Sequence, residues 1–393
     1  MQLTAKQEEG IKIITERYDA HEKYTVVSGY AGTGKSTLVK FAIEALGIAP
    51  ERVAYATYTG KAAEVLRRKG NSNAKTLHKL LYVSIPLPRG GFSRKPATHI
   101  DYDVVVVDEV SMVPKSMIDL LMRHQVYIIF LGDPFQLPMI DKNENHGLLD
   151  HPHIFLDEIM RQAQESEIIR LTMKIRNQET INGFKGEEVK IFKPNELNTG
   201  MLLWADQVIC AKNTTRHSLN QQFRQLKGFE GIIENGEKVV IKRNYWNDSN
   251  KDGEALVNGA TGIIENPFFT FRRLPSNIKI PNRDIQVIQA NFVPEGSAAF
   301  EGVQFDKRFL VEEEPCLDWR VSYQLGKMSN KIGDIVPRQM TYGYAITCHA
   351  AQGSEWENVL VVEENFPFEK VEHARWLYTA ATRASDRLLL VRE

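Results

Sequence analysis

The sequence is poor in cysteine, in long apolar runs and in net charge, and each shortage excludes a class of protein. Its three cysteines are odd in number and far apart, so they predict neither a disulfide framework nor a C-x-x-C metal site and indicate a reducing compartment. No apolar run approaches the roughly 20 residues that span a bilayer, and the first residues lack the apolar core of a signal peptide. We therefore expect a cytoplasmic protein without a membrane partner.

The charges nearly cancel, with 49 Lys and Arg against 50 Asp and Glu and a net charge of -1. A polyanionic partner would therefore have to bind at a local concentration of positive charge. A length of 393 residues predicts two or three domains, and a hydrophobic share of 42% supplies more than one core. This composition excludes a disordered or coiled-coil chain.

Apolar runs without polar alternation, separated by helical patterns, predict a parallel sheet that is buried on both faces. The runs are 24–28, 53–56, 104–107 and 127–131 near the N-terminus, and 359–362 and 388–391 near the C-terminus. The predicted fold class is α/β, with one parallel-sheet domain over 1–155 and a second split between 156–234 and 335–393.

Two stretches differ in their sequence pattern from the α/β segments. Residues 235–334 contain short β-like pieces broken by Gly, Pro and Asn, which predicts a small inserted antiparallel barrel. Gly90 and Gly91 lie between β-like arms, and this predicts a projecting hairpin over about 82–100 in the first domain.

A glycine-rich segment predicts a nucleotide site. It matches G-x-x-x-x-G-K-[ST] between a predicted strand and a predicted helix, and it reads Gly29, Tyr30, Ala31, Gly32, Thr33, Gly34, Lys35, Ser36. The glycines let backbone N–H groups surround a phosphate chain. Lys35 would reach the β- and γ-phosphates, and the Ser36 hydroxyl would bind Mg²⁺.

Polar residues that follow the next buried runs complete this site. Asp108 would contact Mg²⁺ through water, and Glu109 would orient and deprotonate the attacking water. Gln136, just past the run 127–131, can touch both the γ-phosphate and the neighbouring domain. The acid pair favours ATP hydrolysis over a kinase, and the absence of an Asn-Lys-x-Asp sequence disfavours a GTPase.

Together these segments resemble the superfamily 1 helicases, and within them the RecD-like subgroup that moves 5′ to 3′ and includes a small phage helicase. The matching segments, in the order of the family, are 3–7, 29–36, 57–63, 74–81, 108–112, 132–138, 160–162, 342–355 and 377–384. Tyr58 departs from the usual Pro and Ala350 from the frequent Lys, so one contact at position 350 is expected to be weaker.

The resemblance implies two RecA-like motor domains, with a barrel of SH3-like type that carries the signature Asn258–Gly262. It implies that Gln7 reads the adenine edge, that Arg161 touches the γ-phosphate and that Arg383 is an arginine finger. Further nucleotide contacts are implied at Thr37 and Glu355. Without the resemblance, Arg383 would be read as a surface arginine.

The resemblance also implies contacts to nucleic acid in both motor domains. The implied residues are Thr59, Lys61, Thr76, His78, Thr347 and His349. Phe92, next to the hairpin turn, is the candidate for a pin that parts a duplex. The alternative is that Phe92 packs on the neighbouring barrel.

The sequence thus predicts an ATP- and Mg²⁺-dependent DNA helicase that acts on single-stranded DNA and duplex junctions in replication, repair or recombination. We expect a monomer in a bacterial cell or a phage-infected host, with single-strand-binding or replication proteins as possible partners. Two alternatives stay open: a translocase that displaces proteins without unwinding, and a binding module that uses ATP as a switch.

Overall fold

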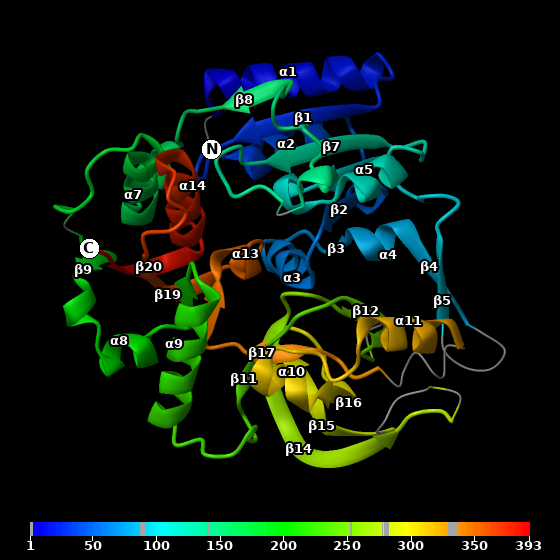
Figure 1. Ribbon diagram of the computed structural model, residues 1–393. Helices are drawn as coiled ribbons and strands as arrows, with labels where there is room; N and C mark the ends of the chain where they lie inside the picture. The colour runs from blue at the N-terminus through cyan, green and yellow to red at the C-terminus, as the bar shows by residue number, and fades with distance from the viewer. Residues whose placement is uncertain are drawn as a thin grey trace.

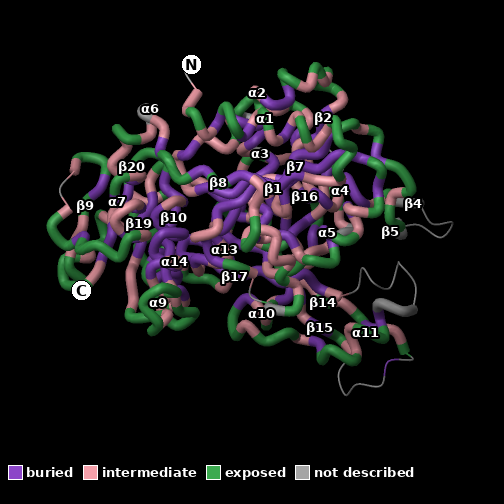
Figure 2. Tube along the Cα trace, turned by 90° about the horizontal axis from the view of Figure 1, so that it is seen from above, coloured by how far each residue is buried: buried purple, intermediate pink, exposed green. Residues whose placement is uncertain are grey.

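The computed structural model describes residues 3–393 apart from 87–91, 140, 185, 252–253, 277, 279–282 and 329–335. Within the described residues, two parallel sheets lie beside a third sheet that is antiparallel (Figure 1). The buried residues follow the strands of the parallel sheets, as Figure 2 shows. The predicted α/β class is therefore confirmed. No helix in the described part of the chain is long and apolar enough to cross a membrane.

The first sheet has the strand order β3-β2-β6-β7-β1-β8, and its pairings are parallel. Its strands are β1 (Tyr24–Gly29), β2 (Val53–Thr57), β3 (Ala74–Thr76), β6 (Val104–Val107), β7 (Tyr127–Gly132) and β8 (Ile154–Leu156). Side chains of α1 (Ala5–Asp19) and α2 (Lys35–Ala45) form the core on one face. On the other face the core is formed with α4 (Leu77–Leu81) and α5 (Lys115–Leu121). The helix α3 (Gly60–Arg68) follows β2.

The second sheet has the order β18-β10-β19-β20-β9 and is also parallel. Its strands are β9 (Val189–Phe192), β10 (Gln207–Cys210), β18 (Ala345–Thr347), β19 (Trp356–Val362) and β20 (Ala384–Val391). One face packs against α7 (Glu167–Arg176) and α14 (Lys370–Ala381). The other packs against α8 (Thr199–Trp204) and α9 (Asn213–Leu226). The short helices α6 (Arg161–Gln164) and α13 (Cys348–Ala351) complete this half.

The third sheet has the order β16-β15-β14-β11-β17 and is antiparallel. Its strands are β11 (Lys238–Ile241), β14 (Thr261–Arg273), β15 (Asp284–Pro294), β16 (Phe300–Asp306) and β17 (Met340–Tyr342). The same segment holds the β12–β13 pair (Tyr245–Ser249 and Ala255–Leu256), α10 (Lys307–Glu312) and α11 (Trp319–Met328). The two edges of the sheet approach at a bridge between Phe305 and Arg338.

The third sheet extends past the predicted boundary at residue 334, because β17 pairs with β11 rather than with the second parallel sheet. β17 is followed almost directly by β18 of the second parallel sheet, so the hydrophobic pattern did not show that the two strands belong to different sheets. At the other junction, β8 pairs with β1 and ends the first sheet at Leu156.

The predicted hairpin region forms two antiparallel strands, β4 (Tyr82–Pro86) and β5 (Phe92–Pro96). The residues between them, including both glycines of the predicted turn, lie outside the described residues. So does the side chain of Phe92, whose backbone pairs with Pro86.

Candidate functional site

The phosphate loop joins β1 to α2, and α2 begins at Lys35. Gly32 and Gly34 both have a φ of 77°, a left-handed conformation that glycine adopts without strain. A Cβ on Gly34 would lie 2.3 Å from Sδ of Met160 and 2.5 Å from Nε2 of Gln7. The first amides of α2 have no partner within the helix, and together with the helix dipole they form a site for an anion.

Lys35 folds back over this loop. Its Nζ donates to the carbonyls of Gly29 (2.7 Å) and Tyr30 (3.0 Å). Ser36 and Thr37 follow in the first turn of α2, and Ser36 is exposed. The ammonium and the hydroxyl that were predicted to contact phosphate and Mg²⁺ thus sit side by side at the start of one helix.

Asp108 and Glu109 follow β6 at the edge of the first sheet where β1 also ends, because carboxyl ends of parallel strands share an edge. Oδ1 of Asp108 accepts a hydrogen bond from the amide of Glu109 (2.8 Å). Burial and the charge of Glu109 raise the pKa of Asp108 to about 6, against the opposing charge of Lys35. Ser36 and Asp108 offer the oxygen ligands that Mg²⁺ takes in nucleoside triphosphatases, so the residues present fit this ion.

Gln136 lies in the segment that follows β7. Its side chain is buried, and Oε1 has no hydrogen-bond partner among the residues that the structure describes. A buried acceptor without a partner costs about 1–3 kcal/mol. An attacking water that donates to Oε1 would remove this cost. The predicted contacts of Gln136 with the γ-phosphate and the neighbouring domain stay predictions.

Two residues from helices that pack on the second sheet contact the phosphate loop, and neither is among the predicted site residues. The hydroxyl of Tyr378 on α14 accepts from the amide of Ala31 (2.8 Å) and donates to Oδ2 of Asp133 (2.5 Å). The guanidinium of Arg176, at the end of α7, lies 3.7 Å from the ring centre of Tyr30. Tyr378 falls inside the matching segment 377–384, which was the available signal, whereas no sequence pattern marks Arg176.

Leu137, in the segment after β7, hydrogen-bonds to α14 and to the residue that follows α13. Its amide donates to Oγ1 of Thr379 on α14 (2.9 Å), and its carbonyl accepts from Nε2 of Gln352 (2.6 Å). Gln352 directly follows α13. One residue of the first half therefore contacts two separate segments of the second.

Of the two arginines predicted to contact the γ-phosphate, the structure describes the side chain of Arg383 but not that of Arg161. Arg383 is 4% exposed, and its guanidinium donates to the carbonyls of Thr379 (3.0 Å) and Ser354 (3.2 Å) and to Oγ1 of Thr382 (3.1 Å). These bonds use three of its five N–H donors. Arg161 begins α6, but its side chain lies outside the described residues.

Gln7 and Glu355 have partners other than those predicted. Gln7 is fully buried, and its Nε2 lies within 3.4 Å of the carbonyl of Thr33 in the phosphate loop. Its Oε1 accepts from the amide of Thr4 (3.0 Å) in a capping box at the start of α1. Glu355 pairs with Lys69 at 3.2 Å. The adenine and nucleotide contacts of Gln7 and Glu355 stay predictions.

A second site is a cavity of about 310 Å³ between the two parallel-sheet halves and the third sheet. The predicted nucleic-acid residues with described side chains all line it, namely Thr59, Lys61, Thr76, His78, Thr347 and His349. The first four belong to β2–α4 and the last two to β18–α13. Gly353, which follows α13, approaches α3 so closely that a Cβ would lie 3.0 Å from Oγ1 of Thr59.

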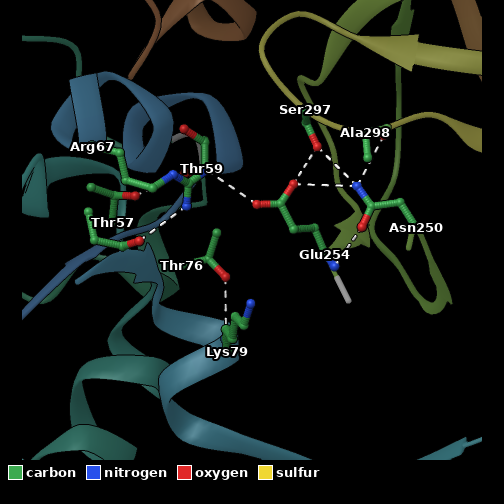
Figure 3. A network of polar contacts seen from close by, with 10 residues as sticks. Thr57, Thr59, Arg67, Thr76, Lys79, Asn250, Glu254, Ser297 and Ala298 are labelled. Atoms are coloured by element: carbon green, nitrogen blue, oxygen red, sulfur yellow. Dashed lines mark hydrogen bonds and ion pairs between the residues drawn. The ribbon is translucent and has the colours of Figure 1, made fainter. Parts of the chain in front are cut away.

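Acidic residues of the third-sheet segment face the cations of this cavity. Arg67 pairs with Oε1 of Glu254 at 3.2 Å, and Figure 3 shows Asn250 and Ser297 behind the same carboxylate. Lys61 pairs with Glu295 at 2.6 Å. Burial alone would raise the pKa of Glu295, but Lys238 and Lys61 hold it at about 2.

Lys61 also contacts the second sheet. Its Nζ lies 3.7 Å from the ring centre of Trp356, which begins β19. Lys61 on α3 thus touches both the second and the third sheet, in addition to facing the cavity. Its predicted contact with a nucleic-acid phosphate would have to compete with Glu295.

The loop, the acid pair and the parallel sheets define a P-loop nucleoside triphosphatase. A family model described as an AAA domain matches residues 2–190, and one described as a UvrD-like helicase C-terminal domain matches residues 342–391. The ATP-dependent RecD2 DNA helicase of Deinococcus radiodurans is 26% identical over 94% of this chain and 47% of its own length. The ATP-dependent DNA helicase dda of phage T4 is 26% identical over 44% of this chain and 43% of its own length.

Another relative, the uncharacterized protein R530 of Acanthamoeba polyphaga mimivirus, is 24% identical over 92% of this chain and 93% of its own length. The chain thus spans about half the length of RecD2 and nearly all of R530. The structure of Bacteroides Pif1 bound to ssDNA is similar over 100% of this chain and 92% of that chain, with a TM-score of 0.51 and 19% identity. At this identity the likeness concerns the fold alone.

Together the two family models and these relatives support a superfamily 1 helicase of the Pif1 and RecD-like group. The resemblance that the sequence motifs indicated is therefore confirmed.

Proposed function

We propose that this chain is a DNA motor that hydrolyses ATP beside the phosphate loop and moves single-stranded DNA through the cavity of about 310 Å³. The observation that carries the proposal is that six predicted contact residues from both parallel-sheet halves line this one cavity. Hydroxyl, Lys and His side chains grip a nucleic-acid backbone through its phosphates, without sequence preference. The relatives named ATP-dependent DNA helicases support DNA as the substrate.

Hydrolysis in this family of sites depends on positioning and on positive charge near the γ-phosphate. Lys35 would bind the β- and γ-phosphates, Glu109 would deprotonate the attacking water, and Gln136 would accept a hydrogen bond from it. Ser36 and Asp108 would hold Mg²⁺, which when bound neutralises charge on the phosphates.

Arg383, and with it Arg161, would approach the γ-phosphate from the second half. An arginine in this role is worth on the order of 10³ to 10⁵ in rate. Because this gain exists only while the two halves are closed on the nucleotide, hydrolysis would be tied to closure. The bonds of Leu137 to Thr379 and Gln352 offer a route by which closure reaches α13 and the cavity.

Strand separation is assigned to the hairpin of β4 and β5, with Phe92 as the pin. We infer that the third sheet is the SH3-like barrel and that the motor moves 5′ to 3′. The first inference is supported by the five antiparallel strands whose edges approach at Phe305 and Arg338. The second is supported by the family alone. Both candidate sites are built from a single chain, so we expect a monomer to suffice.

The test uses partial duplexes that carry either a 5′ or a 3′ single-stranded tail, with ATP and Mg²⁺. We expect single-stranded DNA to stimulate ATP hydrolysis at least tenfold, and we expect unwinding of the 5′-tailed duplex only. Lys35→Ala should abolish both activities while single-strand affinity stays within about threefold.

Each failure points to a different alternative. ATP hydrolysis that ignores DNA would refute the motor and favour a nucleotide-switched binding module. DNA-stimulated hydrolysis without unwinding of either duplex would identify a translocase. Unwinding of the 3′-tailed duplex would reverse the assigned direction.

A further inference from the structure

Tyr378 contacts the phosphate loop but has no role in the hydrolysis proposed above. It lies on α14 of the second half and is 1% exposed, yet its hydroxyl reaches the phosphate loop of the first half. Asp133, which directly follows β7, is 2% exposed and meets the same hydroxyl. Tyr378 thus makes a buried polar contact between the two halves, which in the proposed function close on the nucleotide.

Three hydrogen bonds involve the Tyr378 hydroxyl and the Asp133 carboxylate. The Tyr378 hydroxyl accepts from the Ala31 amide (2.8 Å) and donates to Oδ2 of Asp133 (2.5 Å), while Oδ1 of Asp133 accepts from the amide of Phe135 (2.9 Å). Burial raises the pKa of Tyr378 well above its ordinary value, so the hydroxyl keeps its proton at neutral pH. Because an amide can only donate, the hydroxyl oxygen accepts from Ala31, and its own proton is left for Oδ2 of Asp133.

The ring of Tyr378 is packed among apolar side chains. Phe135 meets it edge to face with ring centres 5.3 Å apart, and the ring belongs to the core of the second half. The helix that carries Tyr378 ends at Ala381, shortly before Arg383. The position of the hydroxyl thus constrains where the end of α14 lies relative to the phosphate loop.

We propose that Tyr378 is a positioning residue for ATP hydrolysis, whose hydroxyl, bound between the Ala31 amide and Asp133, aligns α14 and Arg383 with the phosphate loop. This inference rests on the proposed function. Tyr378 touches the loop through Ala31, outside the first turn of α2 whose amides are left to the phosphates. It therefore acts through alignment rather than by contact with the reacting atoms.

The test is Tyr378→Phe, which keeps the ring and removes only the hydroxyl. If the hydroxyl aligns Arg383, kcat for ATP hydrolysis should fall about 10- to 100-fold, because small errors of placement carry large penalties in rate. The KM for ATP and the affinity for single-stranded DNA should change by no more than about threefold. A kcat within twofold of the wild type would overturn the proposal.

Tyr127→Phe is the matched control. The Tyr127 hydroxyl is also buried between two partners, Oγ1 of Thr25 (2.5 Å) and the carbonyl of Ile14 (3.2 Å), but these lie within the first half. Its loss should lower Tm by an amount comparable to that of Tyr378→Phe and leave kcat within twofold. An equal loss of kcat in both variants would show that Tyr378 acts only through general stability and would overturn the proposal.

A double-mutant cycle tests the route through Asp133. If the hydroxyl works as one unit with that carboxylate, Tyr378→Phe should lower kcat by less than threefold in an Asp133→Asn background. Independent, multiplicative effects would contradict this route. The ratio of variant to wild-type kcat is measured both with and without DNA. If hydrolysis by the wild type does not respond to DNA, the proposed motor is refuted. The kcat ratio would still show whether the Tyr378 hydroxyl contributes to hydrolysis.

Discussion

Two regions where separate parts of this chain meet differ in their polar contacts. Beside the phosphate loop the contacts are buried hydrogen bonds, such as those of Tyr378 to Ala31 and of Leu137 to Thr379. Around the cavity they are ion pairs, such as Arg67 with Glu254, whose side chains are 32% and 29% exposed. Buried bonds depend on geometry and little on salt, whereas partly exposed ion pairs are screened by salt and can be exchanged for other anions.

This difference suits the ligands of the two regions. A nucleotide has one shape, and its site gains from fixed geometry. In the proposed function a DNA strand moves past its site, so each phosphate would have to replace an anion and then leave. The carboxylates of Glu254 and Glu295 pair with Arg67 and Lys61 and would compete with such a phosphate.

The largest expected effect is at the nucleotide region. Arg383→Ala should lower kcat for ATP hydrolysis about 10³-fold or more, because it removes positive charge from the γ-phosphate. The KM for ATP and the affinity for single-stranded DNA should stay within about threefold, as measured by steady-state kinetics and fluorescence anisotropy. Arg387→Ala, on the exposed part of β20, is the control. An equal loss of ATP binding and of turnover would make Arg383 a binding residue.

A smaller effect is expected at the hairpin, which belongs to neither region. Phe92→Ala should lower unwinding of a 5′-tailed duplex about tenfold, since an aromatic ring contributes about 1–3 kcal/mol when a base stacks on it. DNA-stimulated ATP hydrolysis should remain within twofold. Unchanged unwinding would remove Phe92 as the pin and leave packing on the third sheet as its role.

The smallest effect is expected at the ion pairs of the cavity. Glu254→Gln should tighten single-stranded DNA about two- to fivefold at low salt, because a partly exposed pair is worth about 0.2–1 kcal/mol. The gain should vanish at high salt. Glu301→Gln removes the same charge from an exposed position on β16 and should change affinity far less. Equal gains in both variants would show that only the overall charge matters.

The sequence predicted whatever depends on local pattern. The buried strands of both parallel sheets follow from apolar runs such as 104–107, and the phosphate loop follows from its glycines and Lys35. Tyr378 and Arg176 were missed because an ordinary aromatic and an ordinary helix-end arginine gain their roles from residues far away in the chain. The pairing of acids with Arg67 and Lys61 was missed for the same reason.

The most direct test of the central claim, that nucleotide closure and DNA grip are coupled, is a measurement of mutual affinity. The affinity for single-stranded DNA is measured with and without a non-hydrolysable ATP analogue and Mg²⁺, and the affinity for the analogue with and without DNA. A coupling of typical size changes each affinity about 5- to 150-fold, and linkage requires the two factors to be equal. We predict equal factors of at least fivefold. Affinities that are the same with and without the other ligand would contradict the coupling.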